Sequence, residues 1–248
     1  MSESYFAEEQ NFPSPLTKVQ MEELREKDRW KPDVSEGREK GVVIMPGLPF
    51  FGYLRFFNAR PSAGGVDVYI NGRKMAEALD YRMFTKYFRA LPGYYRIGMF
   101  ETGSRRSLIA EEYVKVIPGR IYTAALSGQG EDASVRIIPD RRKEVPKRKA
   151  LVRFIGLSQN APALDAYWND SLVLEDIHYG EVSRFMETPA GTYNLKFREY
   201  ISGRVLAEEP ELNVKGGRAY SVYVVGDMED RTGLQIIATE EGASYLGF

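Results

Sequence analysis

Apolar and polar residues alternate along many short stretches of this chain. The stretch VDVYIN at 66–71 has apolar residues at its even positions and polar or aromatic residues at its odd positions. The same period of two occurs at 95–99, 193–197 and 220–224. Side chains of a β-strand point alternately to its two faces, so this period predicts strands with one face against a core. No stretch shows the strand–helix alternation that a parallel sheet requires.

Turn-forming residues separate these stretches at intervals of about ten residues, as in a β-sandwich. Asn71-Gly72 lies between two apolar stretches and predicts a two-residue hairpin, because both residues tolerate positive φ. Pro and Gly also precede expected strands in LPGYY at 91–95 and TPAGTY at 188–193. In the first half of the chain these signals predict seven strands, at about 52–58, 65–71, 82–89, 94–100, 107–116, 120–127 and 133–138.

The pattern occurs twice, with an offset of 98 residues. The matched residues are Arg55-Phe56 with Arg153-Phe154, Asp67, Tyr69 and Asn71 with Asp165, Tyr167 and Asn169, Tyr81 with Tyr179, Gly93 and Tyr95 with Gly191 and Tyr193, and Gly119, Arg120 and Tyr122 with Gly217, Arg218 and Tyr220. A match that stays in phase over this length indicates two homologous units. We therefore predict an all-β chain with an N-terminal arm (1–51), a β-sandwich repeat (52–140), a linker (141–149) and a second β-sandwich repeat (150–248).

The N-terminal arm belongs to neither repeat. A short helix is predicted at 18–30, because Thr17 and Gln20 fit a capping box and Pro32 would end the helix. The apolar segment 42–51 precedes the first strand and must dock on its own domains or on the sheet edge of another subunit. Its candidate interaction residues are Val43, Ile44, Leu48, Phe50 and Phe51.

The motifs keep the same order in both units. They are LRFFNARP, VDVYING, LPGYY and PGRIY in the first, and VRFIGLSQNAP, LDAYWND, TPAGTY and GGRAY in the second. This order resembles the uncharacterised bacterial domain-of-unknown-function family 4397. The resemblance implies tandem immunoglobulin-like or transthyretin-like sandwiches, often on exported bacterial proteins, and implies no activity. Asp170 replaces Gly72 in the second unit, which puts the same hairpin turn in doubt there.

Composition narrows the function classes. The chain has 248 residues, of which 43% are hydrophobic, and its formal net charge of −1 gives no electrostatic case for nucleic-acid binding. Because there is no cysteine, disulfides and thiolate metal sites are excluded. No apolar run is long enough for a transmembrane helix, and the acidic start MSESYFAEEQNF lacks the features of a signal peptide. The location therefore stays open between the cytoplasm, where the chain is made, and a cell or spore envelope.

No catalytic constellation is present in the sequence. Asp67 and Asp165 would serve as the acids of a hydrolase only if unusual domain docking brought them together, so we expect each to bind its own sheet. His178, the only histidine, is expected to be a surface residue. Nucleophile-elbow, P-loop, dinucleotide and calcium-loop motifs are absent. The sequence predicts no enzyme, no cofactor and no metal.

Aromatic residues provide the alternative to a purely structural function. A sugar- or peptide-binding face would use the residues Tyr94, Tyr95, Tyr167, Trp168, Tyr193 and Tyr223, although alternation assigns at least half of them to the interior. The favoured hypothesis is a non-enzymatic structural or interaction protein that self-assembles through its arm, in a bacterial cell or spore envelope. The alternative is a module that binds envelope polysaccharide or peptide through exposed aromatics, with Trp168 as the leading candidate.

Overall fold

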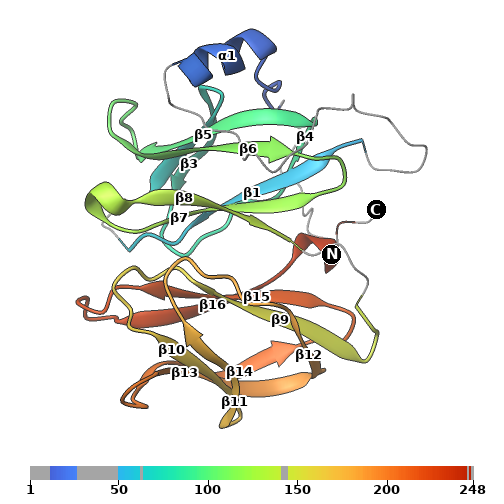
Figure 1. The fold of residues 1–248 in the computed structure, drawn as a ribbon, viewed down its shortest axis with the longest axis vertical. Helices are drawn as coiled ribbons and strands as arrows, with labels where there is room; N and C mark the ends of the chain where they lie inside the picture. The colour runs from blue at the N-terminus through green and yellow to red at the C-terminus, as the bar shows by residue number, and fades with distance from the viewer. Residues whose placement is uncertain (1–11, 27–49, 62–63, 141–144, 245, 247–248) are drawn as a thin grey trace.

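A computed structural model describes residues 12–26, 50–61, 64–140, 145–244 and 246 (Figure 1). The first repeat contains β1 (Gly52–Asn58), β2 (Val66–Ile70), β3 (Arg73–Leu79), β4 (Phe88–Ala90), β5 (Gly93–Glu101), β6 (Leu108–Val116), β7 (Ile121–Ser127), η1 (Gly130–Asp132) and β8 (Ser134–Pro139). The second contains β9 (Lys149–Gly156), β10 (Leu164–Trp168), β11 (Ser171–Ile177), β12 (Met186–Pro189), β13 (Gly191–Glu199), β14 (Val205–Val214), β15 (Ala219–Gly226), β16 (Leu234–Glu240) and η2 (Gly242–Ser244).

Each repeat is a sandwich of two four-stranded sheets. The sheet orders are β4-β1-β7-β8 and β3-β2-β5-β6 in the first repeat, and β12-β9-β15-β16 and β11-β10-β13-β14 in the second. The pairs β1–β7 and β9–β15 are parallel, and the other pairs are antiparallel. Figure 1 shows the four sheets stacked as layers, with α1 (Lys18–Glu26) above the first repeat. The predicted all-β class and the tandem repeat are confirmed.

The sequence prediction missed one strand in each repeat. Among the described residues each repeat has eight strands, because Arg73–Leu79 forms β3 and Ser171–Ile177 forms β11. The sequence of β3, RKMAEAL, consists of residues that favour helices, so it carried no strand signal. Conversely, only the last residues of the predicted strand at 82–89 form β4, and the preceding part makes a single bridge from Phe84 to Phe57.

The hairpin after β2 is the predicted one. Asn71 and Gly72 both have positive φ, 48° and 82°, as a type I′ turn requires. Asn169 and Asp170 take the same conformation in the second repeat, with φ of 49° and 63°. The doubt about this turn is therefore resolved, since a short polar side chain such as that of Asp tolerates the left-handed region.

The two repeats pack through their inner sheets, which contain β1, β7, β9 and β15. Every residue of β1, β7 and β15 is buried, so these strands have a core on both faces. In β1, Leu54 and Phe56 belong to the core of the first repeat. Phe57, on the opposite face, packs with Ile155 and Tyr223 of the second repeat, and its ring centroid lies 5.0 Å from that of Tyr223.

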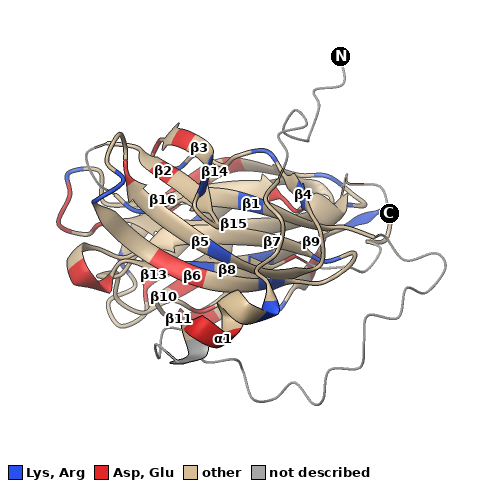
Figure 2. Cartoon of the chain, turned by 90° about the horizontal axis from the view of Figure 1, so that it is seen from above, with Lys and Arg blue, Asp and Glu red and all other residues tan. Residues whose placement is uncertain are grey.

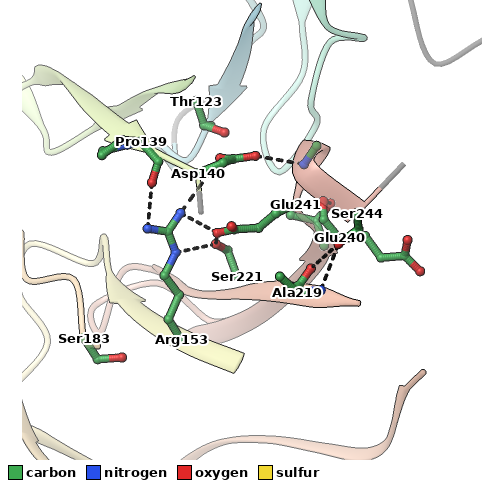
Figure 3. Close-up of polar contacts among 12 residues, drawn as sticks. Thr123, Pro139, Asp140, Arg153, Ser183, Ala219, Ser221, Glu240, Glu241 and Ser244 are labelled. Carbon is green, nitrogen blue, oxygen red and sulfur yellow. Dashed lines mark hydrogen bonds and ion pairs between the residues drawn. The ribbon is translucent and has the colours of Figure 1, made fainter. Parts of the chain in front are cut away.

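A buried polar cluster lies in the same interface. We call it the inter-repeat polar cluster, and its members are Arg55, Thr123, Asp140, Arg153, Ser221 and Glu241. Arg153 donates from Nε to Ser221 (2.8 Å) and from Nη1 to the carbonyl of Pro139 (2.9 Å), and its Nη2 lies 2.5 Å from Glu241 (Figure 3). At the equivalent position Arg55 donates to Thr123 (2.9 Å). The two repeats therefore face each other through the same side of the same sheet.

The arm helix begins where the sequence predicts. Gln20 N–H donates to Thr17 Oγ1 (3.3 Å), and Thr17 N–H donates to Gln20 Oε1 (2.9 Å), which confirms the capping box. The helix is described as far as Glu26, and the remaining predicted residues, 27–30, lie outside the described residues. Seen from above in Figure 2, basic and acidic residues are interspersed over the described strands and α1.

Candidate functional site

A groove at one end of the first sandwich holds a segment of the arm. We call it the first groove and define it by the residues that contact the arm segment 12–16, namely Asn71, Phe88, Gly93, Tyr94 and Tyr95. The backbone N–H of Leu16 donates to the carbonyl of Tyr94 at 2.8 Å. The side-chain amide of Asn71 donates to the carbonyl of Ser14, also at 2.8 Å. The segment is thus held partly by its main chain, as in strand addition.

Two arm side chains fit closely into the first groove. The Phe12 ring lies 5.9 Å from the ring of Phe88 and 5.3 Å from that of Tyr95, measured between centroids. Pro15 lies directly on Gly93, where a Cβ atom would be only 2.4 Å from the Cβ of Pro15. Only glycine allows this approach, so the glycine that begins β5 is part of the binding surface.

The same groove exists in the second repeat. We call it the second groove, and its residues, each 98 positions after a counterpart, are Asn169, Met186, Gly191, Thr192 and Tyr193. Among the described residues no arm segment lies on it: a Cβ at Gly191 would meet nothing closer than 3.5 Å, the distance to the ring of Tyr193. Tyr193 is only partly buried, whereas its counterpart Tyr95 is fully buried. The second groove is therefore open.

A pocket of about 180 Å³ opens next to the second groove. Its lining residues are Val152, Trp168, Val173, Met186, Glu187 and Thr188. The Trp168 ring packs 4.7 Å from the ring of Tyr193, and the residue is only 8% exposed. Its indole Nε1 is buried and has no hydrogen-bond partner among the described residues. A buried donor of this kind requires an acceptor, which a ligand in the pocket would supply.

The expectation that Trp168 is an exposed aromatic is wrong. It occupies a core position at the end of β10, equivalent to Ile70, and packs against Phe154 and Tyr193. Tyr95 and Tyr223 are also fully buried. The other three aromatics are partly buried: Tyr193 borders the second groove, Tyr94 lies under Lys115 and Tyr167 under Arg198. The six aromatics do not form one exposed binding face.

The two aspartates bind their own sheets. Asp67, which is 1% exposed, accepts hydrogen bonds from the backbone N–H groups of Ala78 (3.0 Å) and Gly103 (3.2 Å) and lies 2.8 Å from Lys74. Asp165 accepts from Asp176, the counterpart of Ala78, at 3.0 Å. Ala78 and Asp176 both have positive φ, so each aspartate stabilises a strained residue opposite its strand. Burial opposes the charge of Asp67, but the bonds from Lys74 and the backbone hold its pKa below the ordinary value.

The other repeated residues also connect neighbouring strands. The side-chain oxygens of Asn71 and Asn169 accept hydrogen bonds from the backbone N–H groups of Arg96 and Asn194, both at 2.8 Å. Tyr69 packs against Phe100 with a centroid distance of 5.1 Å. Tyr167 lies under the guanidinium of Arg198, whose Cζ is 4.4 Å from the centroid of the Tyr167 ring.

Two of the candidate interaction residues of the arm are described. Phe50 and Phe51 are 50% and 38% exposed, and their ring centroids lie 5.3 Å apart. Val43, Ile44 and Leu48 lie outside the described residues.

Comparison with known proteins identifies the family. A family model for a domain of unknown function, DUF4397, matches residues 52–167 and 150–245. The chain belongs to this family. Its two tandem family domains account for both sandwiches, and the arm that fills the first groove lies outside them. No curated protein matches the chain.

Three solved structures are similar to this chain at low sequence identity. A streptococcal virulence factor described as binding alpha-glucan is 13% identical, covers 69% of this chain and 92% of its own, and has a TM-score of 0.24. A putative polysaccharide-binding protein of Bacteroides thetaiotaomicron is 11% identical, with coverages of 77% and 96% and a TM-score of 0.26. A carbohydrate-binding module of Eubacterium rectale Amy13K in complex with maltoheptaose is 12% identical, with coverages of 77% and 99% and a TM-score of 0.20. Likenesses with TM-scores this low carry no argument about what this chain binds.

The remaining polar candidates do not assemble a site. His178 is exposed, and its Nε2 lies 3.0 Å from Asp176. Within the described part of the chain, no cluster of three or more His, Cys, Asp or Glu could hold a metal. The described helices include none that is long and apolar enough to cross a membrane.

Sequence analysis missed the grooves. The signals for the first groove were Phe12, Pro15 and the glycine at position 93, but the arm and the repeat are far apart in the sequence. Only the three-dimensional contact of Pro15 with Gly93 shows that they belong together.

Proposed function

We propose that this chain is a non-enzymatic structural or interaction protein that self-assembles through its N-terminal arm. One observation carries the proposal: the first repeat holds the arm segment 12–16 in a groove, and the second repeat has the counterpart residues of that groove with no described segment on them. The contacts in the first groove include a main-chain hydrogen bond, a side-chain hydrogen bond and aromatic packing. These are the interactions with which sheet proteins recognise peptide segments.

Light scattering tests this function. The molar mass of the full chain is measured between about 10 µM and 1 mM, the upper value being comparable to the effective concentration of a tethered segment. The same series is measured for a chain that lacks residues 1–49. We expect the mass of the full chain to rise with concentration and that of the shortened chain to remain monomeric. A full chain that stays monomeric throughout contradicts self-assembly.

A depression on the first repeat, separate from both grooves, favours saccharide binding as an alternative function. On the outer sheet of the first repeat, a depression of about 280 Å³ is lined by Tyr69, Gly72, Arg96, Gly98, Phe100 and Arg105. The Phe100 ring covers Gly98 and packs against the Tyr69 ring, and the guanidinium groups of Arg96 and Arg105 can donate hydrogen bonds to hydroxyl oxygens. Aromatic rings next to hydrogen-bond donors have the chemistry that suits a sugar ring.

Glycan-array binding tests the alternative. Wild type should bind a class of polysaccharide, and Tyr69→Ala should abolish that binding. As a matched control, Tyr200→Ala removes a tyrosine that is 53% exposed and lies in the second repeat. Absence of binding by the wild type, or equal loss in both variants, would count against saccharide recognition at this depression.

A further inference from the structure

We propose that the second groove is the docking site for residues 12–16 of a second copy of this chain. This inference rests on the proposed self-assembly and names the surface that receives the arm. It predicts a head-to-tail contact, in which the arm of one molecule enters the second repeat of the next.

The recognition groups of the first groove recur in the second. Tyr94 supplies a carbonyl to Leu16 in the first groove, and Thr192 has the equivalent place on β13. Asn71 and Asn169 are held in the same way, since each accepts a backbone N–H with its side-chain oxygen at 2.8 Å. The side-chain amide nitrogen of Asn169 therefore has the same place in the second groove as that of Asn71, which donates to Ser14, has in the first. The main-chain contacts of the arm can be reproduced there without rearrangement.

The glycine that accommodates Pro15 also recurs. Pro15 covers Gly93 so closely that a Cβ there would overlap with it, whereas the space above Gly191 is open. A proline entering the second groove would thus find the same small residue under its ring, with only the ring of Tyr193 beside it. Gly93 also has a φ of 146°, which itself favours glycine, whereas Gly191 is outside the positive-φ region.

The pocket beside the second groove has the size and chemistry for an aromatic side chain. Its volume is about 180 Å³, and an apolar cavity of about 150 Å³ is known to take up benzene. Met186 replaces Phe88, the residue against which Phe12 packs in the first groove. Trp168 replaces Ile70 and adds an indole N–H without an acceptor among the described residues. A peptide carbonyl of an incoming arm would provide that acceptor.

Residues 12–16 of the same molecule cannot fill the second groove while they lie in the first. Each chain has one segment 12–16, and in this structure that segment already lies in its own first groove. An arm that binds a neighbour leaves its own groove, so tethering opposes the exchange with an effective concentration of the order of millimolar. We therefore expect weak association that appears at high protein concentration. Arm and groove are different surfaces, so the contact can propagate into rings or filaments.

The blocking variant is Gly191→Val in the full chain. The backbone at Gly191 is outside the positive-φ region and the added Cβ has room, so the variant should fold, which its melting curve will verify. Its methyl groups would occupy the space above position 191, which corresponds to the space that Pro15 takes above Gly93 in the first groove. The control is Glu175→Val, which places the same side chain at an exposed position of β11 outside the second groove.

Two measurements are made on wild type and on both variants. The first is sedimentation velocity of the full chain between about 10 µM and 1 mM. The second is fluorescence anisotropy of a labelled synthetic peptide with the sequence of residues 11–18, titrated with the full chain. We expect association and peptide binding in wild type and Glu175→Val, and at least tenfold weaker peptide binding with no association in Gly191→Val. Trp168→Phe, which removes the indole donor, should weaken the peptide about fivefold.

Each other outcome overturns a defined part of the reasoning. If assembly depends on the arm but is unchanged in Gly191→Val, the docking site is wrong and the proposed function stands. If the peptide binds in a Gly191-dependent way but the chain never associates, a second copy is not the occupant and self-assembly fails. If neither binding nor association occurs, both the docking site and the proposed function fail.

Discussion

Removing one charge from the inter-repeat polar cluster should destabilise the whole chain, and removing an opposite pair should not. Glu241 is fully buried, lies 2.5 Å from Arg153 Nη2 and accepts a hydrogen bond from Ser221 at 2.6 Å. The cluster contains two arginines, Arg55 and Arg153, and two acids, Asp140 and Glu241, so its formal charges balance. Glu241→Leu would leave an unbalanced buried cation, and Arg153→Met an unbalanced buried anion.

The expected magnitudes follow from the geometry. Breaking a buried ion pair by removing one partner costs about 3–5 kcal/mol. Glu241→Leu should be near the lower end, because Arg153 keeps Asp140 at 3.9 Å and the carbonyl of Pro139 at 2.9 Å. Arg153→Met should be near the upper end, because two acids then remain in the interface. In the double variant, Asp140 still accepts hydrogen bonds from Tyr87 Oη and the Gly242 N–H. Because apolar replacement of a buried ion pair is often nearly neutral, the double variant should lose little stability.

Urea unfolding of the four chains at pH 7 measures these differences as a double-mutant cycle. The control is Lys149→Ala, which breaks a pair with Glu187 in which both side chains are about half exposed. That pair should contribute no more than about 1 kcal/mol. The reasoning would be refuted if the single variants lost no more than the control, or if the double variant lost the sum of the two single losses.

Three further predictions concern single positions. Asp67→Ala should cost about 2–3 kcal/mol at pH 7, because it removes the acceptor of two backbone N–H groups and the partner of Lys74. The folded pKa of Asp67 is lowered, so its contribution is complete above about pH 4 and declines as the pH falls through the folded pKa; urea unfolding at pH 7 and pH 2.5 should show the smaller loss at pH 2.5. Phe12→Ala should release the arm, and faster tryptic cleavage after Lys18, with the sandwiches intact, would show it; an unchanged rate would mean that Phe12 does not anchor the arm. Gly72→Ala should cost about 1–2 kcal/mol in thermal unfolding because its φ is 82°, and an equal stability would argue against the positive-φ turn.

The sandwich fold could be predicted from the sequence, because each repeat shows apolar–polar alternation with a period of two, and turn residues separate its strands. Alternation and the Asn71-Gly72 turn fixed β2, and the offset of 98 residues transferred that assignment to β10. The strand β3 was missed because its residues favour helices. The Asn71-Gly72 turn did indicate a hairpin partner directly after it, and the structure shows that this turn signal, rather than the propensity of residues 73–79, gave the correct assignment.

The packing between repeats was not accessible in the same way. Arg55 and Arg153 alternate with core residues, and an arginine in such a position normally indicates a solvent face. In this chain both arginines are buried, because each finds hydroxyl partners on its own sheet and further acceptors in the other repeat. Whether the polar face of a strand contacts water or another sheet depends on how the two repeats pack, and the local sequence pattern of one strand does not predict that packing. The exposure of Trp168 was predicted wrongly for a related reason: the ring of Tyr193, on another strand, packs against it.

The symmetry of the interface explains why function should be sought where the repeats differ. Equivalent faces of the two inner sheets meet, so Arg55 and Arg153 are both used within the chain. The grooves involve the edge strands β4 and β12 and the neighbouring strands β5 and β13, and the described residues include one arm segment. Among the described residues of one molecule, the segment 12–16 lies in the first groove and leaves the second groove open. Under the proposed self-assembly, the segment 12–16 of a second molecule fills it.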